Sequence, residues 1–308
     1  MKDFDNLSLT VIGSGGVKLK LIATDMDGTL VDHMRELPGE NAKAILAAQE
    51  GGILVVVATG RDYTEAIKPL KEAGIRCPII CVNGAEIRSE EGEIIDSTPL
   101  STKQFREIET ILGSLDIYYE IYTTKGAFTK DRKQALQVVI DVIESTGFDA
   151  SEKEALQIAE RRFQQGEITY VESFDNLVED QNVEILKVLA FTKDEKARLD
   201  GKNKLENPFY ELSISSSASD NLEISSRNAQ KGIALKMFAE NKGISMEEVM
   251  AIGDNFNDVS MLKAAGISVA MGNAEPEIKD ICSYITKTND ENGVAFAINK
   301  FLKETVGK

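Results

Sequence analysis

The chain has 308 residues, which is more than one hydrophobic core usually holds and suggests roughly two domains. Its formal net charge of −16, without a dense run of lysine and arginine, argues against nucleic acid or an anionic membrane as a partner. The same charge opposes a phosphorylated ligand, so a phosphate site in this chain requires a cation. Because His33 is the one histidine, the sequence argues strongly against a histidine-based catalytic triad or a multi-histidine metal site.

The compartment is suggested by what the chain lacks. No apolar stretch approaches the roughly 20 residues of a membrane helix, and the early acidic residues fit no secretory signal. Three cysteines, an odd number, fit a reducing environment. We therefore expect a cytoplasmic protein.

Residues 1–18 fit no element of the pattern that follows and are predicted to form an N-terminal extension. The run Gly13–Gly16 superficially resembles a nucleotide-binding loop. However, a dinucleotide site needs a helix after its glycines, and the residues after Gly16 favour a strand. A hairpin or an appended tail is the better interpretation.

Short apolar segments of strand length alternate with helical patterns in the rest of the chain's two outer parts. A helix is predicted over Glu40–Glu50 and ends at Gly51-Gly52. Buried strands are predicted over 19–24, 53–58, 79–82, 249–252, 266–270 and 283–286. This alternation predicts an α/β fold, a Rossmann-like doubly wound parallel sheet.

The middle of the chain has a different pattern, that of an α+β domain inserted into the first. A helix over Ser101–Leu115 begins with the capping box Ser101 and Gln104. Further helices are predicted over 134–144 and 152–162, and strands over 117–122, 183–191 and 209–215. The predicted organisation is therefore a core made of 19–86 and 215–308, with an insert at 87–214.

Cys77 and Cys81 have the spacing of a possible metal pair. Their segment predicts a strand, however, in which residues four apart lie about 13 Å apart, too far to share one ion. Buried core thiols are the better interpretation.

The polar clusters follow predicted core strands, where the ligands of open α/β sheets bind. Asp25 and Asp27 come directly after the first strand, and Gly28 allows a sharp turn and a close approach to an anion. Two adjacent carboxylates favour Mg²⁺, and a carboxylate can attack phosphorus while a second acid transfers protons. The alternative is an Asx-rich turn that caps the next element.

Two further positions suit an anion. Thr59-Gly60-Arg61 follows a strand and offers a hydroxyl group and backbone N–H groups, although Thr59 can equally be a helix cap. Lys231 begins a predicted helix, where a cation is unfavourable unless an anion lies nearby. Its alternative is a solvated surface lysine.

The fourth cluster, Gly253-Asp254-Asn255-Phe256-Asn257-Asp258, also follows a strand. Two acids four residues apart, with amides between them, offer several oxygen ligands to a metal ion. The alternative is that Asp258 caps the helix beginning at Val259.

In order, DMDGTL at 25–30, ATGR at 58–61, Lys231 and GDNFND at 253–258 resemble the four motifs of haloacid dehalogenase superfamily phosphatases. The insert length, NGA at 83–85 and MGNAEPEIK at 271–279 are similar to the Cof-type branch, whose type II cap corresponds to 87–214. One departure is Asn228, where this branch usually has a glycine. Asn tolerates the left-handed backbone that a glycine there would supply.

The resemblance implies a role for each matching residue. Asp25 is the nucleophile and a Mg²⁺ ligand, and Asp27 is the general acid/base that offers its backbone carbonyl to the metal. Thr59 and the Gly60 N–H hold the phosphoryl group, and Lys231 neutralises charge. Asp254 is a metal ligand, supported by Asp258. The residues expected to bind phosphate or substrate are Gly28, Gly60, Arg61, Asn83, Gly84 and Asn257.

The expected activity is hydrolysis of a small phosphorylated metabolite, a sugar phosphate or a phosphorylated cofactor. Asp27 favours phosphate esters over halides, because an alkoxide needs a proton to leave. A phosphotransferase or mutase with the same intermediate and a non-catalytic sensor are the alternatives. In the cap, the aromatic residues either line the substrate site or form sheet core; they are Tyr118, Tyr119, Tyr122 and Phe128.

Overall fold

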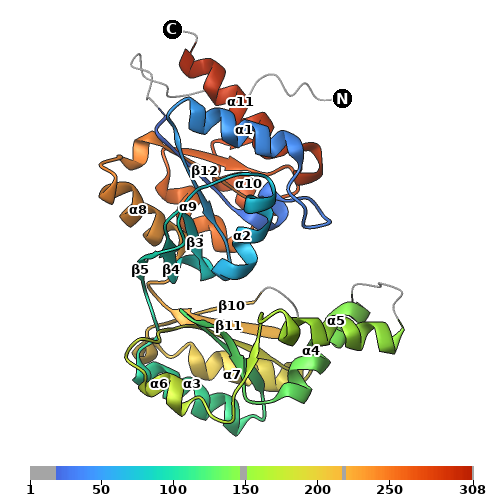
Figure 1. The fold of residues 1–308 in the computed structure, drawn as a ribbon. Coiled ribbons are helices and arrows are strands. Elements are labelled where there is room, and N and C mark those ends of the chain that lie inside the picture. The colour runs from blue at the N-terminus through green and yellow to red at the C-terminus, as the bar shows by residue number, and fades with distance from the viewer. Residues whose placement is uncertain (1–18, 146–150, 217–219, 307–308) are drawn as a thin grey trace.

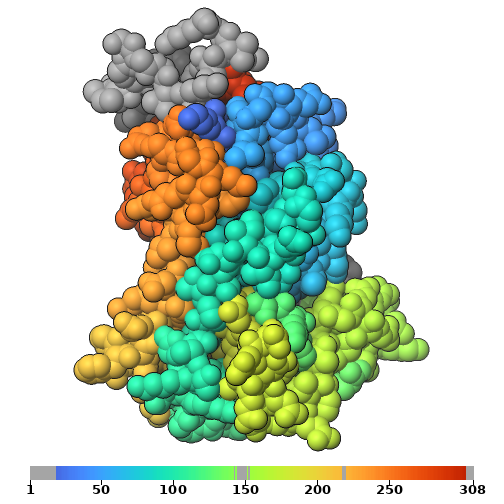
Figure 2. Space-filling model, turned by 60° about the vertical axis from the view of Figure 1, so that its left-hand side comes forward, coloured from blue at the N-terminus to red at the C-terminus, as the bar shows by residue number. Residues whose placement is uncertain are grey.

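The computed structural model describes residues 19–145, 151–216 and 220–306, so the predicted extension at 1–18 lies outside the described residues. The described part contains two separate sheets, one in each half of Figure 1. Figure 2 shows teal and orange chain segments joining the two halves. No helix in the described ranges is long and apolar enough to cross a membrane.

The larger sheet has eight strands in the order β14-β13-β12-β1-β2-β3-β4-β5. Its first six are parallel, and β4 and β5 add an antiparallel edge. The strands are β1 (Leu21–Thr24), β2 (Leu54–Ala58), β3 (Ile79–Cys81), β4 (Glu86–Arg88), β5 (Ile94–Ser97), β12 (Val249–Gly253), β13 (Ile267–Ala270) and β14 (Tyr284–Ile285). This confirms the predicted doubly wound α/β sheet.

The order in which the chain adds strands reverses at β1, because β2 pairs with one edge of β1 and β12 pairs with the other. Such a switch point forms a crevice at the carboxyl ends of the strands. Helices cover both faces, and Figure 1 shows α1 packed with α11 and α8 packed with α9 on opposite faces. They are α1 (Gly39–Glu50), α2 (Tyr63–Glu72), α8 (Lys231–Asn241), α9 (Val259–Ala264), α10 (Pro276–Ile281) and α11 (Gly293–Val306).

The second sheet has six strands in the order β10-β11-β9-β6-β7-β8. They are β6 (Tyr118–Thr123), β7 (Gly126–Thr129), β8 (Thr169–Tyr170), β9 (Ile185–Phe191), β10 (Leu212–Ser215) and β11 (Asn221–Ser226). Its helices are α3 (Thr102–Ser114), α4 (Arg132–Ser145), α5 (Glu152–Gln164), α6 (Asp175–Glu179) and α7 (Glu195–Leu205). We refer to this α+β part as the cap and to the larger sheet with its helices as the core domain.

The cap boundaries differ from the predicted 87–214. Strands β4 and β5 pair with β3 in the core sheet, and β11 pairs with β9 and β10 in the cap sheet. The core sheet therefore extends to Ser97, and the cap sheet ends at Ser226. The error arose because β11 alternates buried and half-buried residues, as a strand of either domain can.

Most predicted elements are confirmed to within a few residues, including the capping box of Ser101 and Gln104 on α3. Cys77 and Cys81 are buried, as expected of core thiols. The predicted strand at 209–215 is wrong at its start, since Phe209 is 92% exposed in a short helical turn. Asn228 is not among the described residues that adopt a positive φ, so this turn does not use a left-handed residue there.

Candidate active site

Three of the four sequence clusters, and Asn83, follow strands of the core sheet. Asp25 follows β1, Thr59 follows β2, Asn83 follows β3 and Asp254 follows β12, whereas Lys231 follows β11 of the cap sheet. Because these strands are parallel, their carboxyl ends lie together. Long-range hydrogen bonds at this edge link the clusters to one another, as described below.

The loop after β1 depends on Gly28. Its φ of +78° is unfavourable for other residues, and a Cβ atom there would lie 2.5 Å from Asp254 Oδ2. The Thr29 hydroxyl donates a hydrogen bond to Asp254 Oδ1 at 2.8 Å, and Asn273 Nδ2 donates to the Gly28 carbonyl at 2.8 Å. Thr29 and Asn273 therefore position this loop, although neither was singled out in the sequence.

Lys231, the first residue of α8, has a completely buried side chain. Its Nζ donates to Asp25 Oδ1 at 2.5 Å and to Asp258 Oδ1 at 2.7 Å. Burial opposes the charge, but the Asp25 and Asp258 carboxylates raise the Lys231 pKa above its ordinary value. The alternative of a solvated surface lysine is therefore wrong, and the cation has the anionic partners that its position required.

Gly84 contributes to this arrangement through close packing. Its φ is +101°, and a Cβ atom there would lie 2.5 Å from the backbone carbonyl of Gln230, the residue before Lys231. Gly84 thus allows the β3 loop to approach the start of α8.

Three carboxylates, those of Asp25, Asp254 and Asp258, have oxygen atoms within 4.8 Å of one another. Burial, and next the charge of Asp258, raise the pKa of Asp25 well above its usual range. The same causes raise the pKa of Asp254 to about 6. The single positive charge of Lys231 does not balance the negative charge of three carboxylates. The remaining negative charge and the hard oxygen donors fit a divalent cation such as Mg²⁺. Asp27 contributes no carboxylate to this group, so its role as a ligand through its backbone carbonyl stays a prediction.

Asp258 also fixes the loop after β12. Its Oδ2 accepts the backbone N–H groups of Asp254 at 3.0 Å and of Asn255 at 3.1 Å. The side chain makes no capping hydrogen bond to α9, so the alternative of a helix cap at Val259 is wrong. Asp258 is held between this loop and Lys231.

Asp27 points toward two arginines. Arg61 donates to its carboxylate from Nε at 2.8 Å and from Nη2 at 2.6 Å, and Arg35 Nε lies at 3.3 Å. Burial raises the Asp27 pKa, but the hydrogen bonds and charge of Arg61 and the charge of Arg35 outweigh it, so the pKa is lowered. Arg35 was not expected at the site from the sequence.

Thr59 is buried, and its Oγ1 accepts the backbone N–H of Arg61 at 3.1 Å. The side chain that caps α2 is Asp62, which accepts the Glu65 N–H at 2.9 Å. The alternative of Thr59 as the helix cap is therefore wrong.

Asn83 connects the core clusters to the cap. Its Oδ1 accepts from Asn257 Nδ2 at 3.1 Å, and its Nδ2 donates to Glu223 Oε2 on β11 at 3.4 Å. A Cβ atom on Gly60 would lie 3.2 Å from Asn83 Oδ1, so Gly60 and Asn83 are close neighbours. Gly60, Asn83 and Asn257, three of the residues expected to bind phosphate or substrate, are thus close together, and Glu223 is an unexpected cap neighbour.

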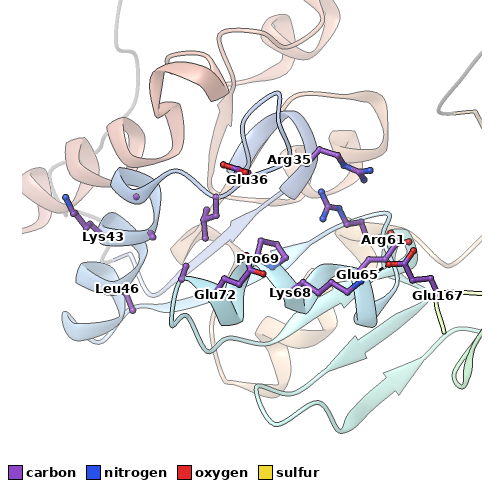
Figure 3. A pocket seen from close by; sticks show the side chains of 14 residues that line it. Arg35, Glu36, Lys43, Leu46, Arg61, Glu65, Lys68, Pro69, Glu72 and Glu167 are labelled. Carbon is purple, nitrogen blue, oxygen red and sulfur yellow. Dashed lines mark hydrogen bonds and ion pairs between the residues drawn. The ribbon is translucent and has the colours of Figure 1, made fainter. Parts of the chain in front are cut away.

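A cleft of about 890 Å³ begins beside the arginines and runs between α1 and α2. Figure 3 shows Arg35 and Arg61 at one end, near Glu65 and Glu167, with Lys43 and Leu46 at the other. Asp25 is not among its lining residues. The cleft therefore does not contain the carboxylate cluster, and it meets the site through Arg35 and Arg61, which contact Asp27.

The cap aromatics divide between the two sheet faces. Tyr119 and Phe128 belong to the hydrophobic cluster beneath α3, as sheet core. Tyr118 and Tyr122 lie in a different cluster, and the Tyr122 ring lies 4.8 Å from Lys187 Nζ.

A sequence model of the haloacid dehalogenase-like hydrolases matches residues 22–298. The chain is 38% identical to phosphatase YwpJ of Bacillus subtilis, over 92% of this chain and 100% of that protein. It is 33% identical to the 5-amino-6-(5-phospho-D-ribitylamino)uracil phosphatase YwtE of the same organism, over 92% and 98% of the two chains. A solved haloacid dehalogenase-like hydrolase from B. subtilis has a TM-score of 0.77 and 37% identity, covering 91% of this chain and 99% of that one.

These matches extend over nearly the whole described chain and include both the core sheet and the cap. The chain therefore belongs to the haloacid dehalogenase superfamily and is a phosphatase of its Cof-type branch.

Proposed function

We propose that this phosphatase hydrolyses a small phosphorylated metabolite through a covalent phospho-aspartate at Asp25, with Mg²⁺ as its cofactor. The observation that carries the proposal is the buried ammonium group of Lys231, held between Asp25 and Asp258 at 2.5 and 2.7 Å. A fixed charge in a dry site is well placed to stabilise the dispersed charge of phosphoryl transfer.

In the first step a carboxylate oxygen of Asp25 attacks phosphorus, and the bond from phosphorus to the leaving oxygen breaks. Asp27, which takes up a proton once its pair with Arg61 has loosened, gives that proton to the leaving oxygen, so the leaving group departs as an alcohol. In the second step Asp27 takes a proton from water as the water oxygen attacks the phosphoryl group. The P–O bond to Asp25 then breaks, and the products are the alcohol and inorganic phosphate.

Arg61 connects substrate binding to the acid/base residue. Its guanidinium group is held by Asp27 in this structure, and guanidinium groups bind phosphate oxygens equally well. An incoming phosphoryl group competes for Arg61 and loosens its pair with Asp27, which frees the carboxyl group to exchange a proton. Thr59, the Gly60 N–H, Asn83 and Asn257 would hold the remaining phosphoryl oxygens.

The carboxylates of Asp25, Asp254 and Asp258, with the Asp27 carbonyl, would hold the Mg²⁺ ion. When bound, it supplies positive charge that offsets the carboxylates and the substrate phosphate. This proposal is supported by the oxygen-only donor set and by the raised pKa values of Asp25 and Asp254.

The test is release of inorganic phosphate from p-nitrophenyl phosphate, with Mg²⁺ and with EDTA. We expect release that requires both the metal and Asp25, so that Asp25→Asn is inactive while folded. Asp290→Asn is the matched control, since this exposed acid pairs with His33 and is not one of the clustered carboxylates. Activity retained by Asp25→Asn or in EDTA would contradict the proposal, and phosphate transferred to an added sugar would identify a phosphotransferase instead.

The relatives' names leave the leaving group open. YwtE is named for a phosphorylated ribityl compound, and a 28% identical Escherichia coli protein, YbhA, is named a pyridoxal phosphate phosphatase. A polyol chain and an aromatic ring would need different side chains in the cap to bind them. A sugar phosphate or a phosphorylated cofactor is therefore the proposed substrate range of this chain.

A further inference from the structure

A polar row crosses the cap sheet on the face turned toward the core domain. The strand registers place Ser213 beside Ser225, Ser225 beside Lys187, and Lys187 beside Tyr122, across β10, β11, β9 and β6. Lys187 Nζ lies 3.4 Å from the carbonyl oxygen of Gly60 in the core domain. The row therefore lies opposite residues proposed to hold the phosphoryl group.

A β-bulge in β9 lies next to Lys187, at the centre of this row. Tyr122 pairs with Lys187, but Thr123 pairs with Ile185, so Leu186 is an extra residue in β9. Leu186 is 1% exposed and belongs to the hydrophobic cluster of the core domain, unlike Ile185 and Val188, which belong to the cap's own cluster. Bulges re-aim side chains and are frequent beside active sites. Here the bulge seats Leu186 in the core domain and directs Lys187 to Gly60.

Lys187 forms an ion pair with Glu223 on β11, with Nζ and Oε2 3.3 Å apart. The two side chains are only 7% and 12% exposed. Glu223 Oε2 also accepts from Asn83 Nδ2 at 3.4 Å. The hydrogen bonds from Lys187 to the Gly60 carbonyl and from Asn83 to Glu223, each 3.4 Å, are long enough for a stronger hydrogen-bonding group to replace them.

A nearly buried ion pair is a poor device for stability, because desolvation offsets much of its attraction. Its placement against Gly60 and Asn83 indicates a role in recognition instead. An ammonium group only donates hydrogen bonds and a carboxylate only accepts them, whereas a hydroxyl group does both. Neighbouring hydroxyl groups of one ligand can therefore satisfy Lys187 and Glu223 together.

We propose that Lys187 and Glu223 determine substrate specificity by binding hydroxyl groups of the leaving group, so that the substrates are sugar or alditol phosphates. This inference rests on the proposed function. A flat aromatic leaving group offers few partners and leaves both charges poorly solvated. A second anionic group is attracted by Lys187 but repelled by Glu223 and by the carboxylates below.

The experiment compares kcat/KM for sorbitol 6-phosphate and for p-nitrophenyl phosphate in the full chain with Mg²⁺. We expect the wild type to favour the alditol ester. In Lys187→Met and in Glu223→Gln, kcat/KM for the alditol ester should fall by roughly 10- to 100-fold, mainly through KM, as expected for a lost hydrogen bond to a charged group. The aryl ester should change by less than about 3-fold, since it lacks the hydroxyl groups whose lost hydrogen bonds cause that fall.

Lys196→Met, at an exposed position on α7, is the matched control and should leave both values unchanged. An equal fall for both esters in the two variants would assign the pair a structural role and overturn the inference, as would no fall for either ester. Glu223→Gln keeps the shape of its side chain, so it tests the pair even if Lys187→Met fails to fold. Failure of the proposed function is distinguishable, because Asp25→Asn would then retain hydrolysis of both esters.

Discussion

Arg61 grips the carboxylate of Asp27 with both arms of its guanidinium group, Nε to Oδ2 at 2.8 Å and Nη2 to Oδ1 at 2.6 Å. A bidentate pair of this kind depends on the planar fork of arginine, which lysine cannot reproduce. The side chain of Arg61 is only 10% exposed, whereas that of Asp27 is 43% exposed, so water reaches the pair from the Asp27 side. The proposed acid/base residue is therefore held by a residue that is itself suited to bind phosphate.

Replacing Arg61 by lysine should separate charge from geometry. Arg61→Lys keeps a cation but loses the fork, and we expect KM for a phosphate ester to rise by about 10-fold, the size of one charge-assisted hydrogen bond. Arg35→Lys should have a smaller effect, because Arg35 is 66% exposed and makes one 3.3 Å contact with Asp27. Steady-state kinetics of the two variants would check this, and equal effects would show that the fork has no special role.

Because Lys231 is buried among the carboxylates of the proposed active site, we expect its replacement to affect both activity and stability. Lys231→Met leaves three neighbouring carboxylates without their buried cation, so without divalent ions we expect a loss of about 3–5 kcal/mol in the free energy of unfolding. Mg²⁺ should recover part of this loss, since it binds only the folded cluster. Urea unfolding with and without Mg²⁺ measures both quantities.

The matched control is Lys236→Met on the same helix. Its exposed pair with Glu240 spans 3.9 Å and should contribute about 0–1 kcal/mol. If Lys231→Met were as stable as this control and still active, the proposed charge balance at the cluster would be wrong.

Three of the four clusters could be predicted from the sequence because each follows a strand of the parallel sheet. Asp25, Thr59 and Asp254 were expected at one edge for that reason alone, and Lys231 because a cation at a helix start needs an anion. Their roles in the reaction stay predictions. Features that depend only on neighbouring residues in the sequence, such as a capping box or the end of a strand, were predicted well.

The cap contribution could not be predicted, because it depends on register. Lys187 and Glu223 come together through the pairing of β9 with β11, and the bulge at Leu186 leaves no mark in the sequence. A signal did exist, since Lys187 is the one charged residue within the apolar strand β9. Assigning β11 to the core domain removed Glu223 from consideration as a cap residue.

Gly84 offers a test of close packing at the site. In Gly84→Ala a left-handed φ and a clash with the Gln230 backbone combine, and we expect at least about 2 kcal/mol of destabilisation. Turnover should also fall, because Gln230 precedes Lys231. Gly74→Ala is the control: its φ is +71°, but its Cβ would meet no atom within 4 Å, so strain of about 1–2 kcal/mol should act alone with turnover retained. Equal activity in the two variants would exclude the packing role of Gly84.

The buried thiol of Cys77 should make the free energy of unfolding depend on pH. Burial raises the pKa of its thiol to about 12, so the folded protein keeps the proton at pH values where the unfolded chain, with an ordinary pKa near 9, releases it. A raised folded-state pKa means that the stabilisation is complete below about pH 9 and declines as pH rises toward 12, by about 1.4 kcal/mol per pH unit. Cys77→Ala removes this proton, so the free-energy difference between wild type and variant should shrink between pH 9 and 10.5. Urea unfolding across this range measures the difference, and a constant value would mean that the thiol titrates alike in both states.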